Sequence, residues 1–202
     1  MKKDFIYLAS ASPRRRELLD QIGVPFQMRP AGLLEQPVEG EAPRAFVSRM
    51  AREKAAAVWQ QVAAQDPQPV LAADTVVVLD DRMFGKPADV EQAKAMLAQL
   101  SGAMHQVLTS VALLWEGQML DQLSISEVRL RATTAAERCA YVETGEPLDK
   151  AGGYAVQGRG AVFVEAVVGS YSGVVGLPLA ETSALLQRFG LPAWLQGKAL
   201  DA

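Results

Sequence analysis

Two serines and three arginines crowd into one short segment, residues 10–16 with the sequence SASPRRR, between an apolar run at residues 5–9 and a helix-like stretch at residues 17–22. A strand that leads into a helix leaves free backbone N–H groups at the positive end of the helix dipole, and Pro13 suits the first helical position. Hydroxyl and guanidinium groups in the same turn add donors that match phosphate oxygens. The segment therefore predicts an anion site, unless Ser12 only caps the helix and the arginines face solvent.

Asp74 is the strongest candidate for a reactive group, because it interrupts an otherwise apolar strand at residues 70–79. A carboxylate in a buried strand is costly unless it is paired or bound to a metal. The alternative is that Asp74 accepts backbone hydrogen bonds at a bulge or at a strand end.

Three lysines on separate elements could add positive charge. Lys54 lies in a helical pattern, Lys86 in a Gly-Lys-Pro turn, and Lys150 at the start of a glycine-rich stretch at residues 145–160. Together they could converge on one polyphosphate, although a single lysine is by default a solvated surface charge.

Several familiar sites are absent from the sequence. There is no Gly-x-x-x-x-Gly-Lys-Ser/Thr phosphate loop and no His-Glu-x-x-His pair. The one histidine, His105, is expected to be structural, which makes a Ser-His-Asp triad improbable. The one cysteine, Cys139, excludes an internal disulfide and a multi-cysteine metal site, and we expect it in the core of a protein from a reducing compartment.

The composition is that of a globular protein, since half of the 202 residues are hydrophobic. The 20 Lys and Arg residues against 23 Asp and Glu residues give a net charge of −3, which disfavours a general nucleic-acid surface and RNA binding through residues 14–16. No apolar stretch approaches the roughly 20 residues that span a bilayer, and the first apolar run is too short for a secretion signal. We therefore expect a cytoplasmic protein with no membrane partner and no stable nucleic-acid partner.

The apolar periodicity predicts alternating strands and helices. Strands are expected at residues 5–9, 26–28, 70–79, 106–115, 118–131 and 161–168, and helices at residues 13–22, 42–64, 89–100, 134–143 and 179–189. The dipeptide Glu116-Gly117 predicts a hairpin, residues 80–81 predict a turn, and Thr133 or Thr134 can cap the helix that follows. The five glycines of residues 145–160 predict a functional loop. These elements predict an α/β fold, a single domain over residues 1–202 with a central mixed, twisted β-sheet flanked by helices.

Seven short segments occur in an order and spacing that closely resemble the Maf family of nucleoside triphosphate pyrophosphatases, over residues 8–189. The segments are SASPRR at residues 10–15, REKA at 52–55, AADT at 72–75, GKP at 85–87, SG with His105 at 101–105, DKAGGYAVQG at 149–158 and VGLP at 175–178. The resemblance implies a Maf/ITPase-like fold, a homodimer, and hydrolysis of a nucleoside triphosphate to the monophosphate and pyrophosphate. One position departs from the family: Ala72 stands where glycine is expected, which matters only if the backbone there needs a positive φ.

The resemblance also implies roles for individual residues. Catalysis falls to Asp74, Lys86 and Lys54, and substrate binding to Ser10, Ser12, Arg14, Arg15 and Lys150. Glu35, from the polar loop at residues 29–43, faces the same pocket in the family, although it could be an ordinary solvated carboxylate. Two carboxylates repel a triphosphate, so Glu35 and Asp74 would require a divalent cation, Mg²⁺ or Mn²⁺. Asp74 would then position or deprotonate a water whose pKa the metal lowers.

Three positions separate two subgroups of the family. Arg14, Thr75 and Gln157 resemble the dTTP/UTP group, whereas the 7-methyl-GTP group typically has Trp, Gln and Glu. The Gln157 amide offers both a donor and an acceptor, which can complement the imide edge of uracil or thymine. We therefore expect dTTP and UTP, or modified pyrimidine nucleotides, as substrates. The alternatives are a 7-methyl-GTP pyrophosphatase and a nucleotide-binding regulator of cell division and septum formation, in which turnover is incidental.

Overall fold

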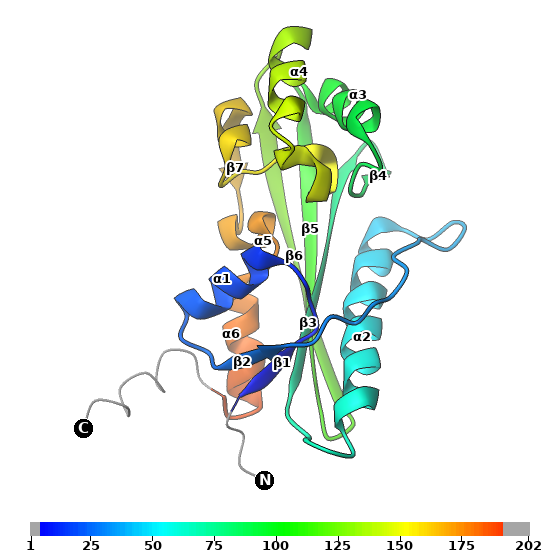
Figure 1. Ribbon diagram of the computed structural model, residues 1–202, viewed down its shortest axis with the longest axis vertical. Coiled ribbons are helices and arrows are strands. Elements are labelled where there is room, and N and C mark those ends of the chain that lie inside the picture. Colours follow the sequence, from blue (N-terminus) through cyan, green and yellow to red (C-terminus); the bar gives the residue numbers. More distant parts are fainter. Residues whose placement is uncertain (1–4, 192–202) are drawn as a thin grey trace, which may run out of the picture. The chain divides into compact units, whose positions relative to one another are not determined.

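The computed structural model describes residues 5–191, in which strands and helices alternate much as the sequence predicts (Figure 1). The strands are β1 (Ile6–Leu8), β2 (Phe26–Met28), β3 (Val70–Leu79), β4 (Arg82–Phe84), β5 (Met104–Trp115), β6 (Gln118–Leu130) and β7 (Val164–Val168). The α-helices are α1 (Pro13–Gln21), α2 (Pro43–Val62), α3 (Val90–Leu100), α4 (Ala135–Glu143), α5 (Tyr171–Val175) and α6 (Leu179–Arg188). Three short 3₁₀ helices are η1 (Glu146–Asp149), η2 (Ala151–Gly153) and η3 (Arg159–Phe163).

Among the described residues, seven strands form one mixed sheet in the order β2-β1-β3-β5-β6-β7, with β4 paired to β3. Strand β1 pairs in parallel with β2 and β3, whereas β4 is antiparallel to β3 and β7 is antiparallel to β6. The predicted α/β fold with a mixed sheet is confirmed.

The chain divides into two compact units. The first unit contains the described residues up to Asp74, residues 109–124 and the described residues from Gly176 onward. The second contains residues 75–108 and 125–175. A single domain over residues 1–202 therefore stays a prediction.

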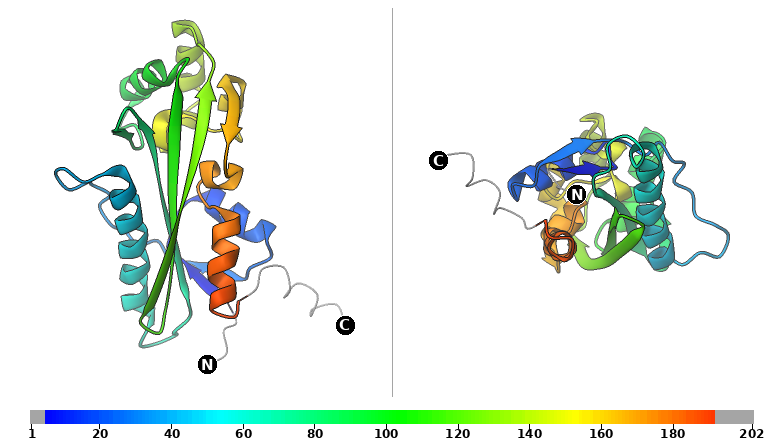
Figure 2. Two further views of the ribbon diagram at one scale, coloured as in Figure 1. Left: turned by 180° about the vertical axis from the view of Figure 1, so that it is seen from behind. Right: turned by 90° about the horizontal axis from the view of Figure 1, so that it is seen from below.

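In the first unit, α2 packs against one face of the sheet. A buried apolar cluster joins Ala51, Ala55 and Val58 of α2 to side chains of β1, β3 and β5 that include Tyr7, Val70, Ala72, Ala112 and Leu114. Because side chains alternate along a strand, Ile6, Leu8 and Leu71 point to the opposite face, where α1 and α6 lie (Figure 2).

In the second unit, α3 and α4 cover a separate apolar cluster. Leu97 and Leu100 of α3 and Tyr141 of α4 pack with Val77 and Phe163. Helix α4 begins with the predicted cap: the Thr134 hydroxyl accepts from the Glu137 N–H, and the Glu137 carboxylate accepts from the Thr134 N–H.

Four details differ from the sequence prediction. Strand β4 and helix α5 are not predicted, because they are three and five residues long and too short to show a period. The strand expected from residue 161 begins only at Val164, since residues 159–163 form η3. Cys139, expected in the core, is only half-buried on α4.

The departure at Ala72 has no conformational consequence. Among the described residues, positive φ angles outside glycine occur only at Asp80, Asp81 and Glu116, in the two tight turns that the sequence predicts. Ala72 lies fully buried within β3, where its methyl group contributes to the core.

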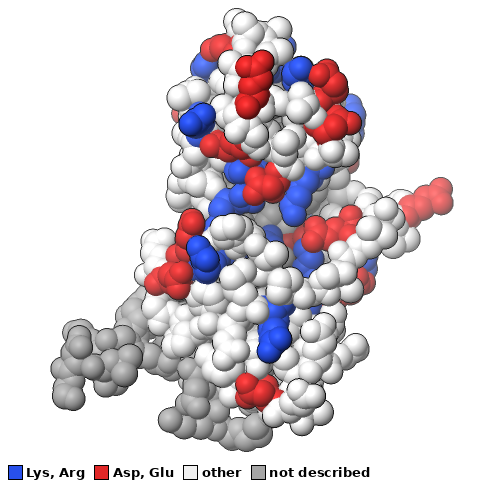
Figure 3. Space-filling view, viewed as in Figure 1, with Lys and Arg blue, Asp and Glu red and all other residues white. Residues whose placement is uncertain are grey.

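Acidic and basic side chains are interspersed on the face drawn in Figure 3, in keeping with the near balance of charge in the sequence. None of the helices described between residues 5 and 191 is long and apolar enough to cross a membrane.

His105 lies in the interior of the second unit, where it is 2% exposed. Its Nε2 atom lies 2.8 Å from the Tyr154 hydroxyl, and its Nδ1 atom has no hydrogen-bond partner. Burial lowers the pKa of His105 to about 4. The histidine is therefore held neutral in the folded protein, as a structural residue should be.

We expect this histidine to make the protein less stable as the pH falls from 6.5 to 4. In that range the unfolded chain binds a proton that the folded chain does not, so the free energy of unfolding decreases with decreasing pH. At about 1.4 kcal/mol per pKa unit, the loss amounts to about 3 kcal/mol. Urea unfolding of wild type and His105→Gln at pH 7 and pH 4 measures it, and an equal pH dependence in the two proteins would contradict the expectation.

Candidate active site

Lys54 joins two carboxylates in the first unit. Its Nζ atom lies 2.6 Å from Asp74 Oδ1 and 2.6 Å from Glu35 Oε1. The side chains of Lys54 and Asp74 are 7% and 5% exposed, whereas that of Glu35 is 42% exposed. Lys54 is therefore not a solvated surface charge, and its ammonium group brings Glu35 and Asp74 together. The role of Glu35 toward a substrate stays a prediction.

The packing of α2 on the sheet explains why Lys54 contacts Asp74. Asp74 lies two residues after Ala72 and four after Val70 on β3, so its side chain is on the same face of the sheet as theirs. That face is the one covered by α2. Lys54 lies on the buried stripe of α2, next to Ala55 and one turn before Val58. A lysine in an apolar helical stripe and an aspartate in an apolar strand are thus signals, visible in the sequence, of a buried ion pair.

Burial raises the pKa of Asp74, and the positive charges of Lys54 and Arg15 only partly offset this effect. The negative charge of Glu35 raises the pKa of Asp74 further. A carboxylate with a raised pKa is a stronger base than a solvated aspartate, so Asp74 is suited to accept a proton.

The SASPRRR segment forms the predicted turn from strand to helix, with Ser12 at the N-cap position of α1 and Pro13 at the first helical position. The Ser12 side chain makes no capping hydrogen bond, so the alternative of a simple serine cap is wrong. Instead, Ser10 Oγ accepts hydrogen bonds from the Ser12 N–H (3.1 Å) and from Arg15 Nη1 (3.3 Å). Arg14 lies half-buried in the first turn of α1.

Arg15 connects this turn to the carboxylates. Its Nε atom donates to the Gly176 carbonyl (2.8 Å), which fixes the guanidinium group against the VGLP segment. Burial lowers the pKa of Arg15, while the charges of Asp74 and Glu35 act in the opposite direction. The guanidinium group therefore lies within electrostatic reach of both carboxylates, where it can meet a phosphate group.

Arg49, on α2, secures the loop that carries Glu35, a role that the sequence analysis missed. Its Nε and Nη2 atoms pair with the two carboxylate oxygens of Glu41 at 2.7 and 2.6 Å, and Nη2 also donates to the Gln36 carbonyl (3.1 Å). Glu41 in turn accepts from the Val38 N–H (3.1 Å). The hydrogen bond from Arg49 lowers the pKa of Glu41 to about 2, so the pair stays charged well below neutral pH.

The second unit carries the other four predicted residues. Thr75 follows Asp74 on β3 and is half-buried, while Lys86, after β4, and Gln157, between η2 and η3, are exposed. Lys150 is held by its own loop, since its Nζ atom donates to the Glu146 carbonyl (2.7 Å) and pairs with Asp149 (2.6 Å). The exposed amide of Gln157 is available to a ligand.

Glu35 and Asp74 are the carboxylates that could hold a metal. Between residues 5 and 191, no three or more His, Cys, Asp or Glu side chains are grouped so as to hold one. Mg²⁺ is commonly bound by one or two carboxylates, with waters and substrate phosphates supplying the other oxygens. Two carboxylates that share a lysine near the predicted anion site fit that pattern.

An α/β fold that places a guanidinium-rich helix start near a buried lysine–aspartate pair suits an enzyme that acts on a phosphorylated substrate. Residues 5–189 match the family model described as Maf-like protein, so the chain belongs to this family. The resemblance inferred from the seven segments is thereby confirmed.

The chain is also similar to curated proteins over nearly its whole length. It is 50% identical over 191 residues to the dTTP/UTP pyrophosphatase of Saccharophagus degradans. These residues cover 94% of this chain and 90% of that protein. It is 53% identical over 188 residues to the dTTP/UTP pyrophosphatase of Alkalilimnicola ehrlichii, covering 91% and 92%, and 49% identical over 192 residues to that of Bordetella avium, covering 92% and 96%.

Proposed function

We propose that the protein hydrolyses dTTP and UTP to the monophosphate and pyrophosphate. The observation that carries the proposal is the buried pair of Lys54 and Asp74, with Arg15 nearby. Support comes from the relatives named dTTP/UTP pyrophosphatase, which are about half identical to this chain.

Some of the residues bind the phosphates, and Asp74 acts on the attacking water. Arg15 and the backbone N–H groups at the start of α1 bind phosphate oxygens, and Lys54 offsets their negative charge. Asp74 orients a water molecule and accepts its proton as the water oxygen bonds to the α-phosphorus. The bond from that phosphorus to the bridging oxygen breaks, and pyrophosphate leaves with the electron pair.

A divalent cation, Mg²⁺ or Mn²⁺, is part of the proposal, with Glu35 and Asp74 as its protein ligands. When bound, it would neutralise phosphate charge and lower the pKa of a bound water. A homodimer and a cytoplasmic location remain predictions from the family resemblance and from the composition.

Release of pyrophosphate from a panel of nucleotides, with and without Mg²⁺, tests the proposal. We expect turnover of dTTP and UTP that requires the metal. Preference for 7-methyl-GTP would assign the protein to the other subgroup. Tight nucleotide binding without release of pyrophosphate would instead favour a regulator of cell division.

Gln157→Glu is expected to lower kcat/KM for dTTP and UTP by roughly 10- to 100-fold, because a carboxylate would face a carbonyl of the base with no proton between them. The loss should be smaller for guanine nucleotides, whose N–H edge can meet a carboxylate. Steady-state kinetics on dTTP, UTP and GTP measure the effect. Gln99→Glu, the same exchange on the exposed side of α3, is the control. Equal losses on all three nucleotides would show that Gln157 does not contact the base.

A further inference from the structure

Two side chains of the second unit hold the glycine-rich loop on both sides of Gln157. On the side that precedes it, the Tyr141 hydroxyl accepts a hydrogen bond from the Ala155 N–H (3.1 Å). On the side that follows it, the Glu146 carboxylate accepts from the Arg159 N–H (3.0 Å) and the Gly160 N–H (3.1 Å).

These two anchors are themselves connected. The Tyr141 hydroxyl donates to Glu146 Oε1 (2.8 Å), so one hydroxyl bridges the backbone before Gln157 and the carboxylate that binds the backbone after it. Burial raises the pKa of Glu146, but the Arg159 N–H, the Tyr141 hydroxyl and the Gly160 N–H lower it more, and the net shift is downward. The carboxylate is therefore charged at neutral pH, and charged acceptors make the stronger hydrogen bonds.

The glycines after Gln157 let the backbone approach these anchors closely. A Cβ atom at Gly158 would lie 2.5 Å from Glu146 Oε2, and one at Gly160 would lie 2.6 Å from the Tyr141 hydroxyl oxygen. Both positions thus exclude any side chain as long as the anchors stay in place.

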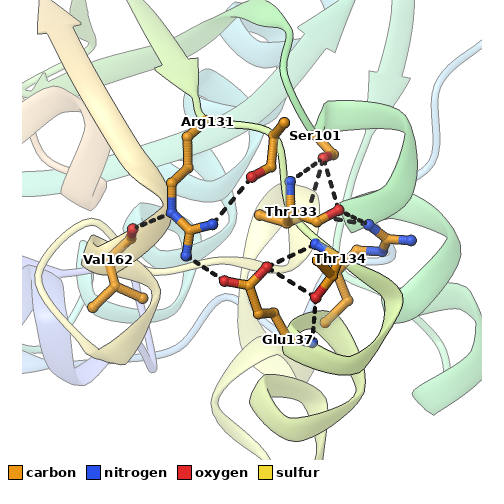
Figure 4. Close-up of polar contacts among 8 residues, drawn as sticks. Ser101, Arg131, Thr133, Thr134, Glu137 and Val162 are labelled. Atoms are coloured by element: carbon orange, nitrogen blue, oxygen red, sulfur yellow. Dashed lines mark hydrogen bonds and ion pairs between the residues drawn. The ribbon is translucent and has the colours of Figure 1, made fainter.

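The residues that follow the loop are fixed separately, by Arg131 (Figure 4). Its Nε atom donates to the Val162 carbonyl (2.9 Å), its backbone N–H donates to the Phe163 carbonyl (2.8 Å), and its Nη2 atom pairs with Glu137 (2.7 Å). This attachment is made at the end of η3, to Val162 and Phe163, five and six residues after Gln157. Closer to Gln157, the side chains that bind the loop backbone are Tyr141 and Glu146. The backbone itself adds a hydrogen bond from the Gly158 N–H to the Ala155 carbonyl (3.3 Å).

We propose that Tyr141 and Glu146 are positioning residues that set the selectivity of Gln157 for the base. The inference rests on the proposed function, because it takes Gln157 as the residue that recognises the base. An amide can distinguish bases only if its donor and acceptor are held in a fixed orientation, and the backbone on either side determines that orientation.

Tyr141→Phe and Glu146→Gln test the proposal. Phenylalanine keeps the ring that packs edge-on against Phe163 at 5.2 Å and loses only the hydroxyl. Glutamine keeps the shape of Glu146 but presents an NH₂ group to one of the two backbone N–H donors. We expect the ratio of kcat/KM for dTTP to that for GTP to fall about 10-fold in each variant, the effect of one lost hydrogen bond or slightly more. The change should lie mainly in KM.

Hydrogen exchange provides the second readout. The amides of Ala155, Arg159 and Gly160 should exchange faster in both variants than in the wild type. Glu137→Gln is the matched control: it makes the same substitution at the partner of Arg131, and should leave the selectivity and these three amides unchanged.

The outcomes separate the two proposals. A wild type that releases no pyrophosphate from dTTP or UTP would overturn the proposed function, and this inference with it, before any variant is compared. A wild type that selects dTTP, together with variants that select it as strongly while the loop amides exchange faster, would overturn only the inference. Tyr141 and Glu146 would then stabilise the loop without serving the site.

Discussion

Asp74→Asn is expected to reduce the turnover of dTTP and UTP by roughly 100- to 10,000-fold, the range for loss of a general base. The amide has nearly the shape of the carboxylate and can still accept a hydrogen bond from Lys54 Nζ, which lies 2.6 Å from Asp74 Oδ1 in the wild type. It cannot accept a proton from water. Pyrophosphate release measures the rate, and the circular dichroism spectrum should be unchanged.

Asp121→Asn is the matched control for this variant. Asp121, on β6 of the first unit, is partly exposed and pairs with Arg52 at 3.6 Å, so the same substitution should leave turnover nearly unchanged. Wild-type turnover in Asp74→Asn would remove Asp74 from the mechanism. Equal losses in both variants would point to a general effect of lost negative charge.

Lys54→Met is expected to destabilise the protein by about 3 to 5 kcal/mol as well as to impair turnover. The substitution leaves the buried Asp74 carboxylate without its ammonium partner, and an uncompensated buried charge has a cost of this size. Glu35 contributes less, because its exposed side chain can turn to water. Urea unfolding at pH 7 measures the loss.

The pH dependence of the Lys54→Met variant follows from the same argument. Without Lys54, the pKa of Asp74 rises further above its value in the unfolded chain, so the folded state binds more protons and becomes more stable as the pH falls. The double variant Lys54→Met/Asp74→Asn should recover much of the stability, because neither member of the buried pair is then charged. Lys94→Met removes a surface lysine paired with the exposed Glu91, and should cost little. A similar small loss for Lys54→Met would show that the buried pair contributes little to stability.

Much of the local structure could be predicted from the sequence. Helix α2 carries a clear helical period of apolar residues, and strand β3 is a nearly continuous apolar run. The turn at Glu116-Gly117 and the cap at Thr134 depend on neighbouring residues. Strand β4 and the 3₁₀ helix η3 could not be predicted, because their sequences show no pattern that is typical of their structure. Strand β4 is stabilised by pairing with β3, and η3 by its contacts with Arg131.

The candidate site divides in the same way. The sequence by itself determined that Lys54 and Asp74 interrupt apolar stripes, and that serine and arginine side chains gather at the start of α1. Only the tertiary structure decided that Lys54 bridges Asp74 and Glu35, and that Glu146 binds backbone groups 13 and 14 residues away. A helix or strand period arises from the geometry of one segment, whereas these contacts join segments whose meeting depends on how the elements pack against one another.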